Sequence, residues 1–282
     1  MKTRAANQAL AIDRDETLIA NRARGRIDLI VSAADGRTRR RRVAEDGSLR
    51  VRFPRTVGGE LEAVIVNTAG GIAGGDRHEV SVSARDNANL VVTTAAAEKI
   101  YRSIGPDASI EVTLDVGAGG RLAWLPQEAI VFDRGRLSRR IDVDISGDGM
   151  VTVAEMAVFG RSAMGELVEQ GSFVDRWRVR RDRRLVFAET VRLDGAVAQK
   201  LAEPGVAAGG AAIATVLVCP GDETLAANVR ALAGSFAGEV GISAWNGIAV
   251  ARLCGKDGAS VRSDLTAVLT ALGAPLPRLW LN

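Results

Sequence analysis

The sequence predicts a mainly β protein of stacked antiparallel or mixed sheets, forming one domain over residues 1–282, with two α-helices near the C-terminus. Apolar and acidic residues alternate along 110–116 and 141–145, which places the apolar side chains on one face of a strand. Turn signals rich in Asp and Gly separate such runs, and helical spacing occurs only late in the chain. We therefore divide the chain into a β-rich part, 1–220, and a helix-containing part, 221–282.

The individual elements follow in chain order. Strands are predicted at Ile27–Ser32, Leu61–Val66, Glu79–Ala84, Leu90–Thr94, Leu122–Leu125, Ala129–Phe132, Met150–Phe159, Phe173–Val179, Leu185–Leu193 and Ile213–Cys219. Large apolar residues recur every three or four positions in Asp222–Phe236, which predicts a helix. A second helix is predicted from an N-cap at Ser263 to Gly273. Between the helices, Gly241–Leu253 predicts a strand pair.

Composition limits the compartment and the kind of stabilisation. A chain of 282 residues can bury enough surface to be stable without disulfides or a structural metal. Cys219 and Cys254 are too few for a disulfide framework and belong to no CxxC motif, so we expect a reducing cytoplasm. The first thirty residues show no secretory signal. The stretch Pro204–Asp222, which is uncharged up to its last residue, contains four glycines and predicts a loop and a buried strand rather than a membrane span.

Arginine dominates the basic residues, and two runs concentrate it, Arg37–Arg42 and Arg176–Arg184. Nucleic-acid binding is one interpretation, but aromatic residues for base stacking make up only 4% of the chain. The alternatives are solvated strand faces or an interface with an acidic protein. We expect no nucleic acid and no membrane among the partners.

Four glycines and an acid occupy one loop between two predicted strands: Gly70, Gly71, Gly74, Gly75 and Asp76. The loop lacks the Lys-Ser/Thr of a Walker motif, and it leads into a strand rather than a helix, so a phosphate cradle is disfavoured. A tight backbone crossing that requires glycine explains the motif better. Asp76 either braces this loop through backbone N–H groups or presents a carboxylate at its mouth.

Carboxylates are the remaining candidates for chemistry. The acids singled out by their surroundings are Asp76, Glu128, Glu155 and Glu166. Paired carboxylates are typical of some β-sheet hydrolases, whereas the sole histidine, His78, has no Gly-x-Ser-x-Gly elbow to serve. Glu155 lies inside an apolar strand, so it is either functional or paired with an arginine such as Arg161.

The sequence cannot build a tight transition-metal site. One histidine and two distant cysteines supply neither a two-His nor a CxxC site. Carboxylates and carbonyls remain as weak, exchangeable ligands. Such ligands favour a protein that passes a metal along over one that keeps it, and we expect no tightly bound cofactor.

Four linked motifs carry a resemblance to a known family. They are Asn67–Asp76, Thr93–Arg102, Trp124–Asp133, and Glu155 with Gly160–Glu166. With the closing segment Leu276–Trp280, they closely resemble the urease accessory proteins of the UreD type, also called UreH. The second motif keeps Thr93, Thr94, Lys99, Tyr101 and Arg102, and the fourth keeps Arg161. The second motif departs from the family pattern at Ala95 and Glu98, where the family commonly has Gln and Thr.

The resemblance implies a mainly β fold with two helices and a non-enzymatic role in maturing urease. Such proteins are scaffolds that bind apo-urease and a UreF-type protein, and through the latter a UreG-type GTPase, as a dimer of heteromers. Nickel is implied to be in transit through an internal water-filled channel. We expect Asp76, Glu128 and Glu155, and less strongly Glu166, to line it; the alternative is that they are structural acids paired with Arg102 or Arg161. A paired-carboxylate hydrolase and an arginine-rich nucleic-acid binder are the competing function classes.

Overall fold

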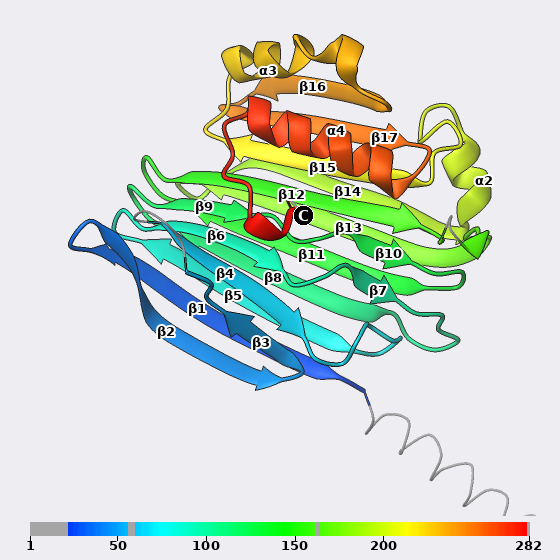
Figure 1. The fold of residues 1–282 in the computed structure, drawn as a ribbon, viewed down its shortest axis with the longest axis horizontal. Coiled ribbons are helices and arrows are strands. Elements are labelled where there is room, and N and C mark those ends of the chain that lie inside the picture. The colour runs from blue at the N-terminus through cyan, green and yellow to red at the C-terminus, as the bar shows by residue number, and fades with distance from the viewer. Residues whose placement is uncertain (1–21, 56–59, 162–163, 281–282) are drawn as a thin grey trace, which may run out of the picture.

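Two β-sheets pack face to face, and helices cover the outer face of one of them (Figure 1). The structure is a computed structural model that describes residues 22–55, 60–161 and 164–280. The mainly β fold with helices late in the chain is the predicted one. In the part of the chain that is described, no helix is both long and apolar enough to cross a membrane.

The seven-stranded sheet has the order β14-β13-β11-β8-β5-β1-β2. Its five inner strands run parallel to one another, and the edge strands β2 and β14 are antiparallel to their neighbours. The bounds are β1 Arg24–Ala34, β2 Arg37–Gly47, β5 Arg77–Arg85, β8 Ala108–Val116, β11 Arg136–Ile145, β13 Gln170–Arg181 and β14 Arg184–Ala196.

The ten-stranded sheet has the order β16-β17-β15-β12-β9-β6-β4-β3, with β10 beside β12 and β7 beside β10. Here β4, β6, β9 and β12 are parallel to one another, and β10 is parallel to both β12 and β7. The strands β3, β15, β16 and β17 pair antiparallel with their neighbours. The bounds are β3 Leu49–Arg52, β4 Leu61–Asn67, β6 Asn89–Thr94, β7 Glu98–Ile100, β9 Arg121–Trp124, β10 Ala129–Val131, β12 Met150–Phe159, β15 Ala212–Cys219, β16 Glu239–Trp245 and β17 Ile248–Gly255.

Most turns between β4 and β13 connect strands of opposite sheets rather than hairpin partners. The chain passes from β5 to β6, from β8 to β9 and from β11 to β12, changing sheet each time. Parallel neighbours need a crossover connection, and here a strand of the other sheet supplies it. The turn signals therefore predicted the strand ends correctly, but their spacing suggested more antiparallel pairing than the mixed sheets contain.

All the predicted strands are present, and the described residues form three further strands that alternation does not predict. These are β2, β3 and β7. Both arginine runs lie on strands of the seven-stranded sheet, the first on β2 and the second on β13 and β14. All but one of the residues of β2 are exposed, and β1 is the only strand that pairs with it in the part of the chain described here.

The helices differ from the prediction in their bounds. Helix α3, Glu223–Arg230, begins after the Asp222 cap, whose carboxylate accepts the N–H of Leu225, but it ends before the predicted Phe236. Gly234 and Ser235 are weak helix formers, and a short 3₁₀ turn replaces the last predicted turn. Helix α4, Gly258–Ala271, is capped by Asp257, so the predicted N-cap at Ser263 is wrong. A short helix, α2 (Val197–Ala202), was not predicted.

The apolar core has three parts. One cluster fills the sandwich around β1, β5, β8 and β9, and a second fills its α2 end around Phe159 and Phe173. The third lies between the outer face of the ten-stranded sheet and the helices α3 and α4. The first two clusters are separated by a polar level across the sandwich, which is where the candidate site lies.

Candidate functional site between the sheets

A row of residues in register crosses four parallel strands at the polar level. His78 on β5 lies beside Ile110 on β8, which lies beside Arg139 on β11, which lies beside Asp175 on β13. Side chains two residues apart on a strand share a face, so each polar residue replaces an apolar one on the inward face. The row thus interrupts the core at a single height.

Arg139 is the centre of a buried ion cluster. Its Nε donates to Oδ1 of Asp175 at 3.0 Å and its Nη2 to Oδ2 at 2.6 Å, a bidentate pair. Its Nη1 reaches across to Oε2 of Glu155, on β12 of the opposite sheet. The three side chains are nearly inaccessible to solvent. Although burial alone would lower the pKa of Arg139, Asp175 and Glu155 raise it, so the guanidinium stays charged.

Glu155 carries the surplus charge of this cluster. One guanidinium faces two carboxylates, and Asp175 already holds two of its N–H groups. The other oxygen of Glu155, Oε1, accepts the indole N–H of Trp124 at 2.8 Å. Burial raises the pKa of Glu155 to about 7; Arg139 opposes this rise and Asp175 adds to it. The carboxyl is therefore held in place by two donors but is not neutralised by a cation of its own.

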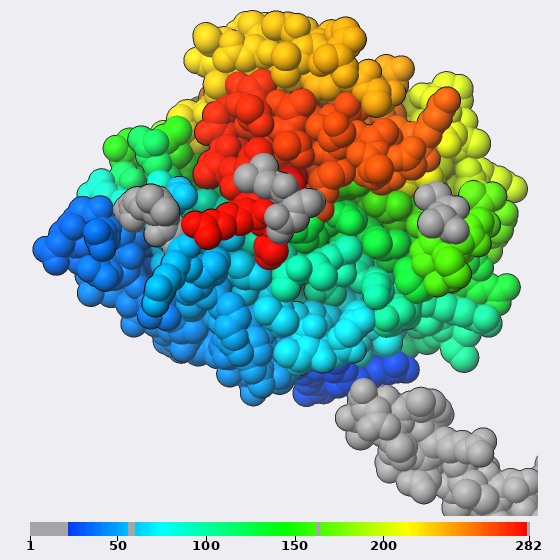
Figure 2. Space-filling view, viewed as in Figure 1, coloured from blue at the N-terminus to red at the C-terminus, as the bar shows by residue number. Residues whose placement is uncertain are grey.

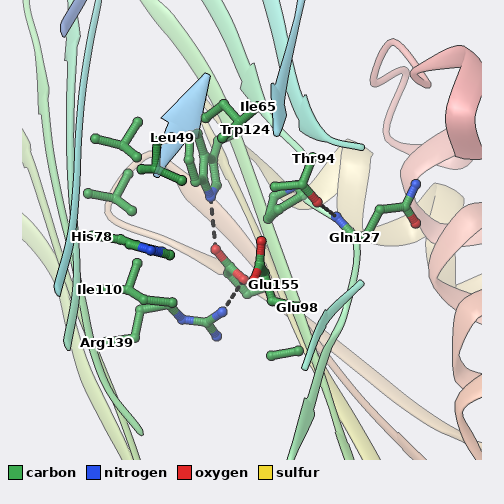
Figure 3. Close-up of a pocket in the computed structure, with 14 residues that line it drawn as sticks. Leu49, Ile65, His78, Thr94, Glu98, Ile110, Trp124, Gln127, Arg139 and Glu155 are labelled. Carbon is green, nitrogen blue, oxygen red and sulfur yellow. Dashed lines mark hydrogen bonds and ion pairs between the residues drawn. The ribbon is translucent and has the colours of Figure 1, made fainter. Parts of the chain in front are cut away.

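The cluster forms one wall of a cavity of about 60 Å³ between the sheets. Its lining is mostly apolar, with four titratable side chains: His78, Glu98, Arg139 and Glu155. Figure 3 shows His78 and Arg139 reaching in from the seven-stranded sheet, and Glu98 and Glu155 meeting them from the opposite side. Of these four, only Glu155 is among the metal-path acids predicted from the sequence.

Glu98 and His78 are both held by neutral partners. Oε2 of Glu98 accepts the side-chain N–H of Asn67 at 3.0 Å, and burial raises the pKa of Glu98 although this bond opposes the rise. Nε2 of His78 lies 3.2 Å from the hydroxyl of Ser48. Burial lowers the pKa of His78 despite the nearby Asp76, so the imidazole is neutral at pH 7. The cavity therefore holds more carboxylates than cations.

The ten-stranded sheet is interrupted beside this cavity. Strand β6 ends at Thr94 before β7 begins at Glu98, and β9 ends at Trp124 before β10 begins at Ala129. Across the break, the N–H of Gln127 donates to the hydroxyl of Thr94 at 2.9 Å. The Thr94 hydroxyl thus takes the place of the backbone carbonyl that would accept this N–H in a continuous sheet. Pro126, Gln127 and Thr94 all line the cavity, so the break forms part of its wall.

Asp76 braces the glycine-rich loop through backbone N–H groups, which is one of the two alternatives predicted for it. Its Oδ2 accepts the N–H of Ala73 at 2.7 Å and its Oδ1 accepts the N–H of Ala23 at 2.8 Å. Gly70 and Gly75 have φ values of 77° and 87°, which only glycine adopts without strain. The predicted backbone crossing is therefore confirmed, and Asp76 is buried within it rather than among the cavity lining.

Gly74 lies so close to the facing loop 103–106 that a side chain there should be costly. A Cβ atom there would lie 1.8 Å from Oγ of Ser103 and 2.6 Å from the carbonyl oxygen of Pro106. We expect Gly74→Ala to lower the free energy of unfolding by about 1–3 kcal/mol, because the backbone of the facing loop must move. Chemical denaturation measures this. Gly105→Ala is the control, since nothing lies within 4 Å of its Cβ, and equal stabilities of the two variants would contradict the close approach.

The remaining predicted acids lie elsewhere. Oε2 of Glu128 is 2.8 Å from Nη2 of Arg262 on α4, and Oε2 of Glu166 is 2.6 Å from Nε of Arg161. No two of the four predicted acids bond to each other in the described residues. The suggested pairing of Glu155 with Arg161 is wrong, because Arg139 takes that place.

The other motif residues support the frame of the site. The hydroxyl of Tyr101 donates to the carbonyl of Gly70 at 2.9 Å, and Lys99 accepts from the N–H of Ile72 through its backbone carbonyl. The backbone of Arg102 forms an isolated antiparallel β-bridge with Gly135. Thr93 is buried on the face of β6 opposite Thr94, and its hydroxyl has no partner among the described residues.

Arg139, Asp175 and His78 were missed, although the sequence contained a signal for them. Alternation around Ile141 continues backward to Arg139 and Leu137, all on the inward face. Asp175 likewise lies between the buried Phe173 and Trp177. A charged residue in phase with an apolar face is costly unless it is paired, so this phase identifies buried ion clusters.

The arrangement suits weak and exchangeable binding of a cation. Among the described residues, no three His, Cys, Asp or Glu side chains are grouped closely enough to hold a metal ion together. The cavity nevertheless offers carboxylate oxygens, one neutral imidazole and too little positive charge. These groups can coordinate a divalent cation without retaining it.

Comparison with known proteins identifies relatives along nearly the whole chain. Residues 23–281 match a family model described as UreD urease accessory protein. A protein named urease accessory protein UreD from Bradyrhizobium diazoefficiens is 58% identical over 93% of this chain and 95% of its own length. Two proteins of that name from Rhodopseudomonas palustris are 57% identical over 93% of the chain and 92% of the relative, and 50% identical over the full length of both.

Proposed function

The chain belongs to the UreD family of urease accessory proteins, and from this membership we propose that it is a non-enzymatic scaffold for inserting nickel into apo-urease. In this proposal it works in the cytoplasm, bound to apo-urease and to a UreF-type protein, as a dimer of heteromers. A UreG-type GTPase is linked through the UreF-type protein. Nickel is cargo and not a resident cofactor.

The cavity between the sheets is the observation that carries the nickel part of this proposal. Arg139 is the one cation in its wall among the described residues, and it is shared by Asp175 and Glu155. Glu98 adds a further carboxylate with only a neutral partner. An interior with this excess of acidic groups is stabilised either by protons or by a visiting cation.

Of the predicted acids, Glu155 fits the path best because it faces the cavity. Glu128 immediately precedes β10, next to the break in the sheet, and we assign it to the point where the path leaves the interior. Asp76 is committed to two backbone N–H groups, and Glu166 to an exposed ion pair with Arg161, so their proposed role in the path is weaker. Glu98 and His78 join Glu155 in the proposal.

Deleting and restoring this one gene in cells that carry the urease operon tests the scaffold role. We expect deletion to leave urease abundant, inactive and poor in nickel, and restoration to recover both activity and bound nickel. Urease that matures normally without the chain would contradict the proposal, and turnover of a substrate by the purified chain would then be the next measurement, as expected for a paired-carboxylate hydrolase.

Glu98→Gln tests the cavity itself. The amide keeps an acceptor for Asn67 but removes the negative charge, so we expect normal folding and normal binding to apo-urease, with several-fold slower recovery of urease activity at limiting nickel. Glu79→Gln, on an exposed side chain of the outer sheet face, is the matched control. Equal recovery in the two variants would remove Glu98 from the path.

A further inference from the structure

The C-terminal segment lies over the break in the ten-stranded sheet. Arg278–Trp280 forms a short 3₁₀ turn in front of the ends of β6 and β9 (Figure 1). In the space-filling view this red segment lies at the surface between α4 and the green and cyan strands (Figure 2). Trp280 is nonetheless buried, because its ring packs into the cluster beneath the helices.

Two hydrogen bonds fasten this segment to the loop 125–128, and Arg262 on α4 adds two more. The indole N–H of Trp280 donates to the carbonyl of Leu125 at 3.1 Å, and Nε2 of Gln127 donates to the carbonyl of Leu279 at 3.2 Å. Arg262 donates to Oε1 of Gln127 and to Oε2 of Glu128. We call Arg262, Leu279 and Trp280 the clasp.

The clasp is a connected unit rather than a set of separate bonds. The guanidinium of Arg262 lies 4.4 Å from the centre of the Trp280 ring, so the residue that binds the loop also stacks on the residue that covers it. Its side chain is only 25% exposed, which strengthens these contacts relative to a surface pair. Losing the Arg262 guanidinium therefore loosens both Gln127 and Trp280.

Gln127 connects the clasp with the cavity. Its backbone N–H is tied to Thr94 inside the break, and the residue lines the cavity, while Figure 3 shows its side chain turned away toward the C-terminal helix. The segment 125–128 is thus a thin wall with the cavity on one side and the clasp on the other. No strand of the sheet continues through this wall.

We propose that the clasp closes the window between β6 and β7 and between β9 and β10, and so controls passage of a divalent cation between the intersheet cavity and the outer face of the sheet. This inference rests on the proposed function, because it assigns a regulated opening to the same cavity. Arg262 and Trp280 are positioning residues in it, since they act through Gln127 and Glu128.

Nickel itself is the probe, and Trp124 in the cavity wall is the reporter. The full chain is labelled with 5-fluorotryptophan, and paramagnetic Ni²⁺ broadens the fluorine resonance of any ring that it approaches. After Ni²⁺ is added at one fixed concentration, we expect the Trp124 resonance of Arg262→Met to broaden at least fivefold faster than that of wild type. Trp280→Phe, which keeps a ring but removes the bond to Leu125, should give a smaller change in the same direction.

Arg230→Met is the matched control, because Arg230 pairs with Glu223 and with the carbonyl of Ile242 on α3 and β16, away from the loop. Unchanged fluorine shifts of Trp177 establish that each variant is folded. Equal rates of Trp124 broadening in wild type, Arg262→Met and Trp280→Phe would overturn the proposed role of the clasp and leave the nickel path intact. If Ni²⁺ broadens Trp124 in none of the proteins, the cavity is not a nickel path, and both the nickel path and the role of the clasp are overturned.

Discussion

Replacing Arg139 with methionine is expected to lower the free energy of unfolding by about 3–5 kcal/mol, the largest loss expected of any single substitution considered for this chain. The variant leaves Asp175 and Glu155 buried without a cation, and both lie in the interior of the sandwich. Two unpaired carboxylates a short distance apart must take up protons or admit water. Either response weakens the packing between the two sheets.

Urea unfolding of Arg139→Met beside Arg140→Met measures this loss. Arg140 is the next residue of β11 and points outward with 56% of its side chain exposed. Its partner Asp142 keeps Arg180 as a second partner, so the control should lose less than about 1 kcal/mol. Similar losses at the two positions would mean that the interior pair contributes no more than a surface pair.

A combined variant separates structure from function in this cluster. Arg139→Met with Asp175→Leu and Glu155→Gln removes all three charges while keeping similar volumes, and such replacements are often neutral or stabilising. We expect most of the stability to return without recovery of nickel delivery to urease. Recovery of both would show that the cluster is structural only.

The same cluster marks where sequence-based prediction succeeded and where it ended. Alternation predicted β8 and β11 because half-buried strands repeat every two residues, and it placed Ile141 on the inward face. The pairing of Arg139 with Asp175 depends on a register between strands far apart in sequence, which no local pattern encodes. Glu155 was found from its apolar neighbours, but its partner was misassigned for this reason.

Tertiary contacts also explain the missed elements. Strand β2 has no apolar alternation, and it forms because β1 offers it an edge along most of its length. Helix α4 is capped by Asp257 rather than Ser263 because the Asp257 carboxylate accepts the N–H of Ser260, nearly two turns earlier than expected. Both cases involve a weak local preference overridden by a specific partner.

The second large effect is a dependence of stability on pH that arises at Glu155. Burial raises the pKa of this carboxyl from an ordinary value of 4.5 to about 7, so the folded protein holds a proton that the unfolded chain has released between these values. A raised carboxyl pKa contributes stability fully below pH 4.5 and loses it as the pH rises through 7. The difference corresponds to roughly 3 kcal/mol.

Glu155→Gln isolates this contribution, because the amide resembles the protonated acid and does not titrate. It can accept from only one of the two donors, Arg139 and Trp124, which changes stability by an amount that is independent of pH. We therefore expect the unfolding free energy of wild type, relative to the variant, to fall as the pH rises from 5 to 7 and to level off above this range in urea titrations. A flat difference would mean that Arg139 keeps Glu155 ionised throughout. Glu155 would then carry its negative charge at every pH in this range, and nickel would meet no competition from protons at that carboxylate.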